Sequence, residues 1–107
     1  MAHYLLQVSY ATNAVKAMVA NPQNREDPAR KVVESMGGKL HAFYFALGEF
    51  DVVMIAEFPD NVSAAAVSLA TGATGALSRF ETTALMTTAD GMEAMRKAKA
   101  GAYSPPA

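Results

Sequence analysis

His41 is the side chain best placed for acid–base chemistry in this chain of 107 residues. It lies within an apolar run that is typical of a strand, two residues before Phe43. An imidazole there could act as a general base or bind a haem iron, because it titrates near neutral pH. The alternative is a partly exposed strand histidine without a chemical role. His3 is expected on the surface, and the spacing of the two histidines does not indicate a metal site.

Four charged residues form two further pairs that could do chemistry. Glu49 and Asp51 are two residues apart, as are Arg79 and Glu81, so the members of each pair share one face of a strand. Paired carboxylates can separate their pKa values for acid–base work, and an arginine can bind an anion. The structural alternatives are an Asp51 that accepts backbone N–H bonds in a turn, and an ion network that joins Arg79 and Glu81 with Asp51 and Glu57.

No motif of a known reaction accompanies these residues. Cysteine is absent, which excludes a disulfide, a thiolate metal site and a cysteine nucleophile. The sequence contains no phosphate loop, no Gly-x-Ser-x-Gly and no dinucleotide fingerprint. Whether the protein catalyses a reaction therefore stays open at this point, and its cofactor, if it has one, is unknown.

Composition and charge narrow the class of protein. With 51% hydrophobic and 18% charged residues, the chain has the composition of one globular domain. The net charge of −1 is spread without a basic cluster, which argues against nucleic acid as a partner. No apolar run reaches the roughly 18 residues of a transmembrane helix, and the N-terminus lacks the features of a signal peptide. We therefore expect a cytoplasmic protein with no membrane partner.

The hydrophobic periodicity predicts four strands and four helical segments. Strands are expected over residues 3–10, over two stretches between 37 and 60 that are joined by a tight turn at Leu47-Gly48-Glu49, and over 77–86. The first helix should begin after a Thr12 cap, break at Asn21-Pro22 and restart with Asp27 as the cap. Two more helices are expected at about 62–73, after Asp60 or Asn61, and from Thr87 or Thr88 to about residue 100.

This order is β-α-β-β-α-β with a broken first helix and an additional C-terminal helix. It predicts the ferredoxin-like arrangement, an α+β fold with one four-stranded antiparallel sheet that carries both main helices on one face. We expect a single domain over residues 1–101 and an extended tail over residues 102–107. Tyr103 is expected to anchor this tail on a neighbouring subunit.

The two faces of the predicted sheet differ in polarity. Even-numbered positions are almost all apolar, and we assign them to the core under the helices: Tyr4, Leu6, Val8 and Tyr10; Phe50, Val52, Met54, Ala56 and Phe58; Phe80, Thr82, Ala84 and Met86. Odd-numbered positions mix apolar residues such as Leu5 and Val53 with charged ones. Such a face is too apolar for solvent and too polar for a monomer core. It predicts a homodimer or a multiple of dimers. For the strand around His41, the pattern does not determine which side chains lie on which face of the sheet.

Several segments resemble one family of small, mostly bacterial proteins. They are Tyr4-Leu5-Leu6 with Ser9-Tyr10, Glu34-Ser35-Met36-Gly37-Gly38-Lys39-Leu40, Ala42-Phe43-Tyr44-Phe45-Ala46-Leu47-Gly48-Glu49-Phe50-Asp51 and Pro59-Asp60-Asn61. Together they resemble the GYD domain family over residues 3–95, with Gly48-Glu49-Phe50-Asp51 in place of a literal Gly-Tyr-Asp. The resemblance implies the dimeric α+β barrel, in which two sheets pack face to face, but no assigned reaction.

Three functions fit these expectations, and the third is a purely structural oligomer, for example a subunit whose tail docks on its neighbour. The first is a small oligomeric module that binds a small apolar or aromatic molecule, or regulates through it, in a pocket between the sheets. The second is a small cofactor-free or haem-dependent enzyme that uses the same pocket. The expected lining of the pocket is Leu5, Gln7, His41, Asp51, Val53, Ile55, Arg79 and Glu81.

Overall fold

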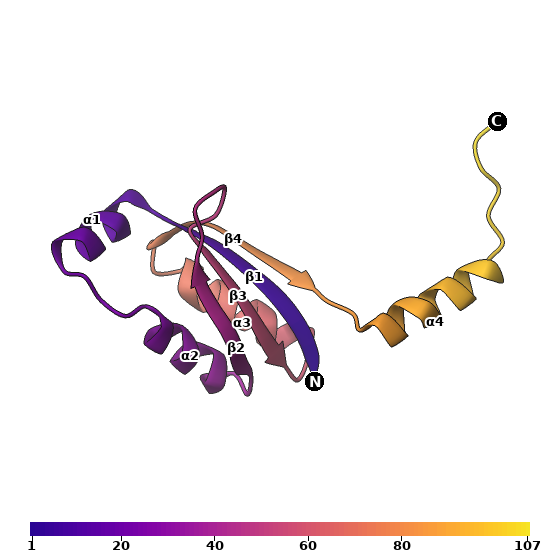
Figure 1. Ribbon diagram of the computed structural model, residues 1–107, viewed down its shortest axis with the longest axis horizontal. Coiled ribbons are helices and arrows are strands. Elements are labelled where there is room, and N and C mark those ends of the chain that lie inside the picture. Colours follow the sequence, from indigo (N-terminus) through magenta and orange to yellow (C-terminus); the bar gives the residue numbers. More distant parts are fainter.

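The computed structural model describes residues 1–107 as one antiparallel sheet with four helices. The elements are β1 (Ala2–Tyr10), α1 (Thr12–Ala20), α2 (Glu26–Ser35), β2 (Lys39–Phe45), β3 (Val52–Phe58), α3 (Asn61–Gly72), β4 (Leu77–Ala84) and α4 (Thr88–Lys99). The strand order is β2-β3-β1-β4 (Figure 1), and every neighbouring pair is antiparallel. The predicted fold class is therefore confirmed, including the broken first helix and the additional helix at the end.

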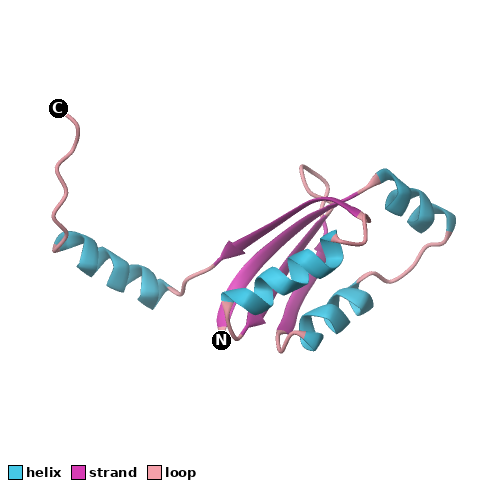
Figure 2. Cartoon of the chain, turned by 180° about the vertical axis from the view of Figure 1, so that it is seen from behind, coloured by secondary structure: helices cyan, strands magenta, loops and turns pink.

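Helices α2 and α3 cover one face of the sheet, and no helix covers the other (Figure 2). The alternation of side chains along β1 and β3 decides which residues are covered. The even-numbered side chains of both strands point to the helices, as predicted, and Leu6, Ala56 and Phe58 are completely buried. With residues of β2, α2 and α3 they form one core: Tyr4, Leu6, Val8, Val33, Leu40, Val52, Met54, Ala56, Phe58, Ala64 and Val67.

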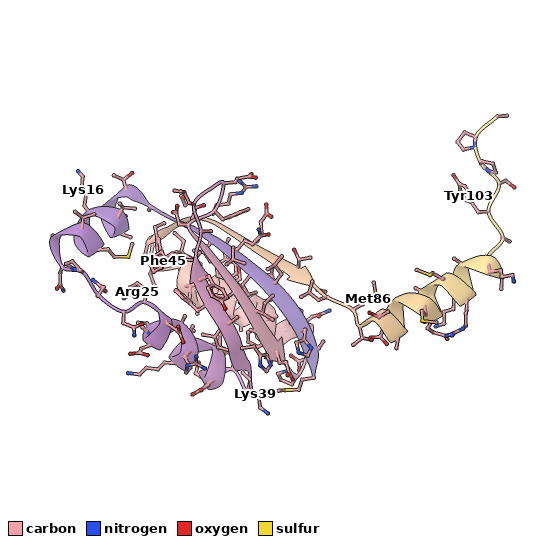
Figure 3. The ribbon with its side chains drawn as sticks, viewed as in Figure 1. Lys16, Arg25, Lys39, Phe45, Met86 and Tyr103 are labelled. Carbon is pink, nitrogen blue, oxygen red and sulfur yellow. The ribbon has the colours of Figure 1, made fainter.

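Helices α1 and α4 contribute no buried residue to this core. Figure 1 shows that α4 leaves the sheet after β4 and projects away from it, followed by the extended tail. Met86 and Tyr103, labelled in Figure 3, lie on this projecting part and are 72% and 80% exposed. Exposed apolar side chains mark a surface that meets another molecule when they form a contiguous patch.

Two of the predicted helix caps were wrong. The cap of α1 is Ala11, whose side chain makes no capping hydrogen bond, so Thr12 is already the first helical residue. Helix α2 begins at Glu26, because the side-chain oxygen of Asn24 accepts the N–H groups of Glu26 and Asp27 and so starts the helix before Asp27. The expected cap of α3 is confirmed, since the Asp60 side chain accepts the Ser63 N–H.

The hairpin between β2 and β3 has a longer connection than the predicted tight turn. The strands end at Phe45 and restart at Val52, and the Ala46 N–H donates to the Asp51 carbonyl over 2.8 Å to close the loop between them. Phe50 turns inward and is only 8% exposed. Asp51 donates its own N–H to the Val8 carbonyl. The last residues of the loop are thus held in place, since Asp51 binds β1 and the Arg79 guanidinium lies over the Phe50 ring.

A β-bulge in β2 explains why its orientation could not be derived from alternation. The pairing with β3 shifts between Leu40, which faces Ala56, and Ala42, which faces Ile55. His41 is the extra residue, and side-chain alternation therefore restarts after it. As a result Leu40 and Phe43 both contribute to the helix-covered side although they are three residues apart.

The prediction for β4 was only partly right. Phe80 packs against the core, but Thr82 and Ala84 are exposed, and the strand ends before Met86. The reason is the position of β4 at the edge of the sheet, where a groove between this strand and α3 leaves both side chains open to solvent.

Replacing Asp60 by alanine should lower the free energy of unfolding at neutral pH, because α3 loses the side chain that caps it. The Asp60 carboxylate accepts the backbone N–H of Ser63 over 2.8 Å, and this hydrogen bond lowers the pKa of Asp60 below its ordinary value. A carboxyl whose pKa is lower in the folded state stabilises the fold above its ordinary pKa, and this stabilisation is lost as the pH falls through the lowered pKa. Urea unfolding should show that the variant and the wild type differ less at about pH 3 than at neutral pH.

Asp90→Ala is the matched control, because Asp90 lies in the first turn of α4, which contributes nothing to the core. We expect this variant to leave the unfolding of the sheet unchanged at both pH values. A difference between wild type and Asp60→Ala that is as large in acid as at neutral pH would contradict a role for the ionised carboxylate.

Candidate functional site

The sheet face without helices, called the open face below, carries the odd-numbered side chains of β1 and β3. Leu5 pairs with Ile55, and Gln7 pairs with Val53 on one side and with Glu81 on the other. Five of the eight predicted lining residues are thus direct neighbours in the middle of this face. Leu5, Gln7, Val53 and Ile55 are half-buried even without a covering layer.

Asp51, a sixth predicted residue, is used by the backbone at one end of the open face. Its Oδ2 accepts the Tyr10 N–H over 2.9 Å, while its own N–H and carbonyl bind Val8 and Ala46. These bonds tie the hairpin loop to β1. The structure therefore favours the structural interpretation of Asp51 over that of a free acid–base group.

Arg79, the seventh predicted lining residue, lies in an exposed ion network. Its guanidinium donates to Glu49 Oε1 and to Glu81 Oε1, both over 2.8 Å, and lies 4.5 Å above the centre of the Phe50 ring. The hydrogen bonds to Glu49 and Glu81 raise the pKa of Arg79. A bound anion would have to displace two carboxylates, so the network fits the structural alternative better. The expected pair of Arg79 with Glu81 is confirmed, and its second partner is Glu49 rather than Asp51 or Glu57.

His41 is the eighth predicted lining residue. It lies close to two residues that the sequence pattern had not placed beside it. Its Nε2 lies 2.6 Å from Glu57 Oε1, and Nε2 of His3 lies 3.4 Å from the same oxygen. The two imidazole rings are stacked, with 5.4 Å between their centres. One ligand atom from each residue lies within 4.8 Å of the others. We call His3, His41 and Glu57 the histidine–glutamate cluster.

Three adjacent strands position this cluster at the end of the sheet where Lys39 is labelled in Figure 3. Glu57 is on the middle strand β3, in register with His3 of β1, and the bulge of β2 brings His41 to its other side. The hydrogen bond from His41 is the largest cause that lowers the pKa of Glu57. One feature of the sequence could have indicated this cluster, namely the antiparallel register. In an antiparallel pair the start of β1 must lie opposite the end of β3.

A separate cavity of about 190 Å³ lies on the helix side of the sheet, between it and α2 and α3. Most of its lining is apolar, including Val32, Phe43 and Val67, and its polar groups include Tyr10 and Arg25. Burial raises the pKa of Tyr10, while nearby Arg25 opposes the shift. This cavity was not predicted, and its volume is below the several hundred Å³ that are typical of ligand pockets.

Comparison with known proteins gives one family. The GYD domain family matches residues 4–95 of the chain. No curated protein matches it. The helices of the structure are also all too short or too polar to cross a lipid bilayer.

Proposed function

The chain belongs to the GYD domain family, and from this premise we propose that it is a homo-oligomeric module that binds a small molecule between paired sheets. The assembly is a homodimer or a multiple of dimers, and its setting is the bacterial cytoplasm. The single observation that carries the proposal is the composition of the open face, where Leu5, Val53 and Ile55 lie side by side without a covering helix.

A second copy of the same chain is the occupant that suits this face. Tyr44 of β2 extends the apolar strip beside Val53 and is 69% exposed. A stable contact between subunits buries at least about 1,000 Å² in total, which a four-stranded sheet face can supply. Two such faces that pack against each other form the dimeric α+β barrel.

The projecting helix α4 supports the same assembly. Met86, Met92 and Met95 are exposed, and α4 lies away from its own sheet (Figure 1). Methionine side chains adapt to irregular apolar surfaces. The groove between α3 and β4, lined by small residues such as Ala65 and Ala84, offers such a surface on a second copy. We propose that α4 and the tail with Tyr103 dock on the neighbouring subunit.

The proposed pocket lies between the two open faces and takes a small apolar or aromatic molecule. Apolar walls with a few polar groups are typical of ligand sites. The lining comprises Leu5, Gln7, His41, Asp51, Val53, Ile55, Arg79 and Glu81.

A small enzyme is the second candidate function, because His41 is paired with a carboxylate on the open face. An imidazole beside a carboxylate suits either a general base or an axial ligand. An absorption spectrum distinguishes a haem-dependent enzyme from a protein without haem, since a Soret band would indicate haem. A spectrum without it, together with no turnover of the bound molecule, would favour the binding module.

Light scattering and native mass spectrometry of the purified protein test the proposal. We expect a dimer or a multiple of dimers at micromolar concentration, with a co-purified small molecule that is released on denaturation. A variant that is monomeric should lose the molecule if it binds between the sheets, and should retain it if it binds in the helix-side cavity. A stable wild-type monomer would overturn the proposal.

A further inference from the structure

We propose that the histidine–glutamate cluster is a binding site for a divalent transition-metal ion of the Zn²⁺ class. The two imidazoles and the carboxylate come from three adjacent strands of one chain. All three ligands therefore come from one chain, and none is supplied by a second subunit.

The positions of the donor atoms carry the proposal. Both histidines place Nε2 close to the same oxygen, Glu57 Oε1, from opposite sides of β3. With metal–ligand bonds of about 2.0–2.2 Å, the donor atoms of a tetrahedral site lie about 3.3–3.6 Å apart. The His3–Glu57 distance of 3.4 Å already matches this spacing. The His41–Glu57 distance of 2.6 Å must widen to admit an ion.

The side chains have the freedom for this adjustment while their backbones are fixed. His3 and His41 are 46% and 42% exposed, so their rings can rotate and an ion can enter from solvent. The backbones belong to paired strands, which hold the three donors on one surface. Glu57 is 20% exposed and thus the most enclosed of the three ligands.

The donor set selects the class of ion. Two imidazoles and one carboxylate suit zinc, iron, cobalt or nickel, whereas calcium and magnesium prefer oxygen ligands. Three protein ligands leave at least one coordination position open for water or for another ligand. The cation at Lys39 and the N-terminal amine near Glu57 work against binding, which favours a site of moderate rather than extreme affinity.

Isothermal titration of Zn²⁺ into the full chain, free of any histidine tag, tests the site, with Co²⁺ absorption as a second readout. We expect one ion per chain with a dissociation constant in the micromolar range or below, and an increase in melting temperature with the Zn²⁺ concentration. His3→Ala, His41→Ala and Glu57→Gln should each weaken Zn²⁺ binding at least tenfold. Mg²⁺ should give no comparable binding.

Glu26→Gln is the matched control, because Glu26 is an exposed carboxylate that binds Arg30 instead of a histidine. It should retain the wild-type affinity for Zn²⁺. Circular dichroism and melting without metal establish that each variant is folded. The proposal is overturned if the wild type binds no Zn²⁺ up to millimolar concentration, or if the three cluster variants bind it as well as Glu26→Gln does. The cluster would then be a hydrogen-bonded histidine–carboxylate group only.

Discussion

We expect Val53→Asp to convert the proposed oligomer into a folded monomer. Val53 lies on the central strand β3, in register with Gln7 on one side and Tyr44 on the other, in the middle of the open face. It is only half-buried in the single chain, so an aspartate there can reach water and the subunit can still fold. In the paired sheets the same carboxylate would lose its water without gaining a partner, which costs several kcal/mol. A two-fold axis would repeat this cost in each subunit.

The dissociation constant of the dimer should therefore rise by about a thousandfold or more, which corresponds to about 4 kcal/mol. Sedimentation or light scattering over a concentration series measures it. Val62→Asp is the matched control, because Val62 is 78% exposed near the start of α3, where an acidic residue suits the helix dipole. It should assemble like the wild type. If both variants assemble equally well, the open face is not the contact between subunits.

The fold could be predicted because alternation and helix signals agree over most of the chain. In β1 and β3 each second side chain is apolar, and these are the residues that the structure buries. The errors occur where one contact overrides the local pattern. A single extra residue at His41 reverses the alternation of β2. Asn24 starts α2 earlier than Asp27 does, and Asp51 binds the backbone of β1 before β3 begins.

The candidate site could be predicted only in part, since it depends on pairing between distant strands. Alternation placed Leu5, Val53 and Ile55 on one face, and the structure makes them neighbours. The histidine–glutamate cluster joins residues 3, 41 and 57, whose spacing along the chain carries no ligand pattern. Only the register of β1 against β3, together with the bulge in β2, brings Glu57 between the two imidazoles.

Gly38→Ala should strongly destabilise the fold and open the histidine–glutamate cluster as well. Gly38 is buried just before β2, at the point where α2 ends. A Cβ atom there would lie 2.5 Å from the Glu57 carbonyl oxygen and 2.7 Å from a ring carbon of Phe58. Neither group can move easily, because one is β3 backbone and the other is a completely buried ring. The start of β2 must therefore move away from β3.

We expect the free energy of unfolding to fall by about 3 kcal/mol, at the upper end for an overpacked site, as measured by urea unfolding. The matched control is Gly48→Ala in the hairpin loop, where an added Cβ meets nothing within 4 Å and the change should stay within about 0.5 kcal/mol. Because His41 follows Gly38 on β2 and Glu57 is on β3, the displaced strand should also separate their side chains. The folded fraction of Gly38→Ala should then bind Zn²⁺ more weakly than Gly48→Ala. Equal stability of the two variants would show that β2 can move away from β3 at little cost. The strand backbones would then not hold the ligands of the metal site in fixed positions, which contradicts the proposed site.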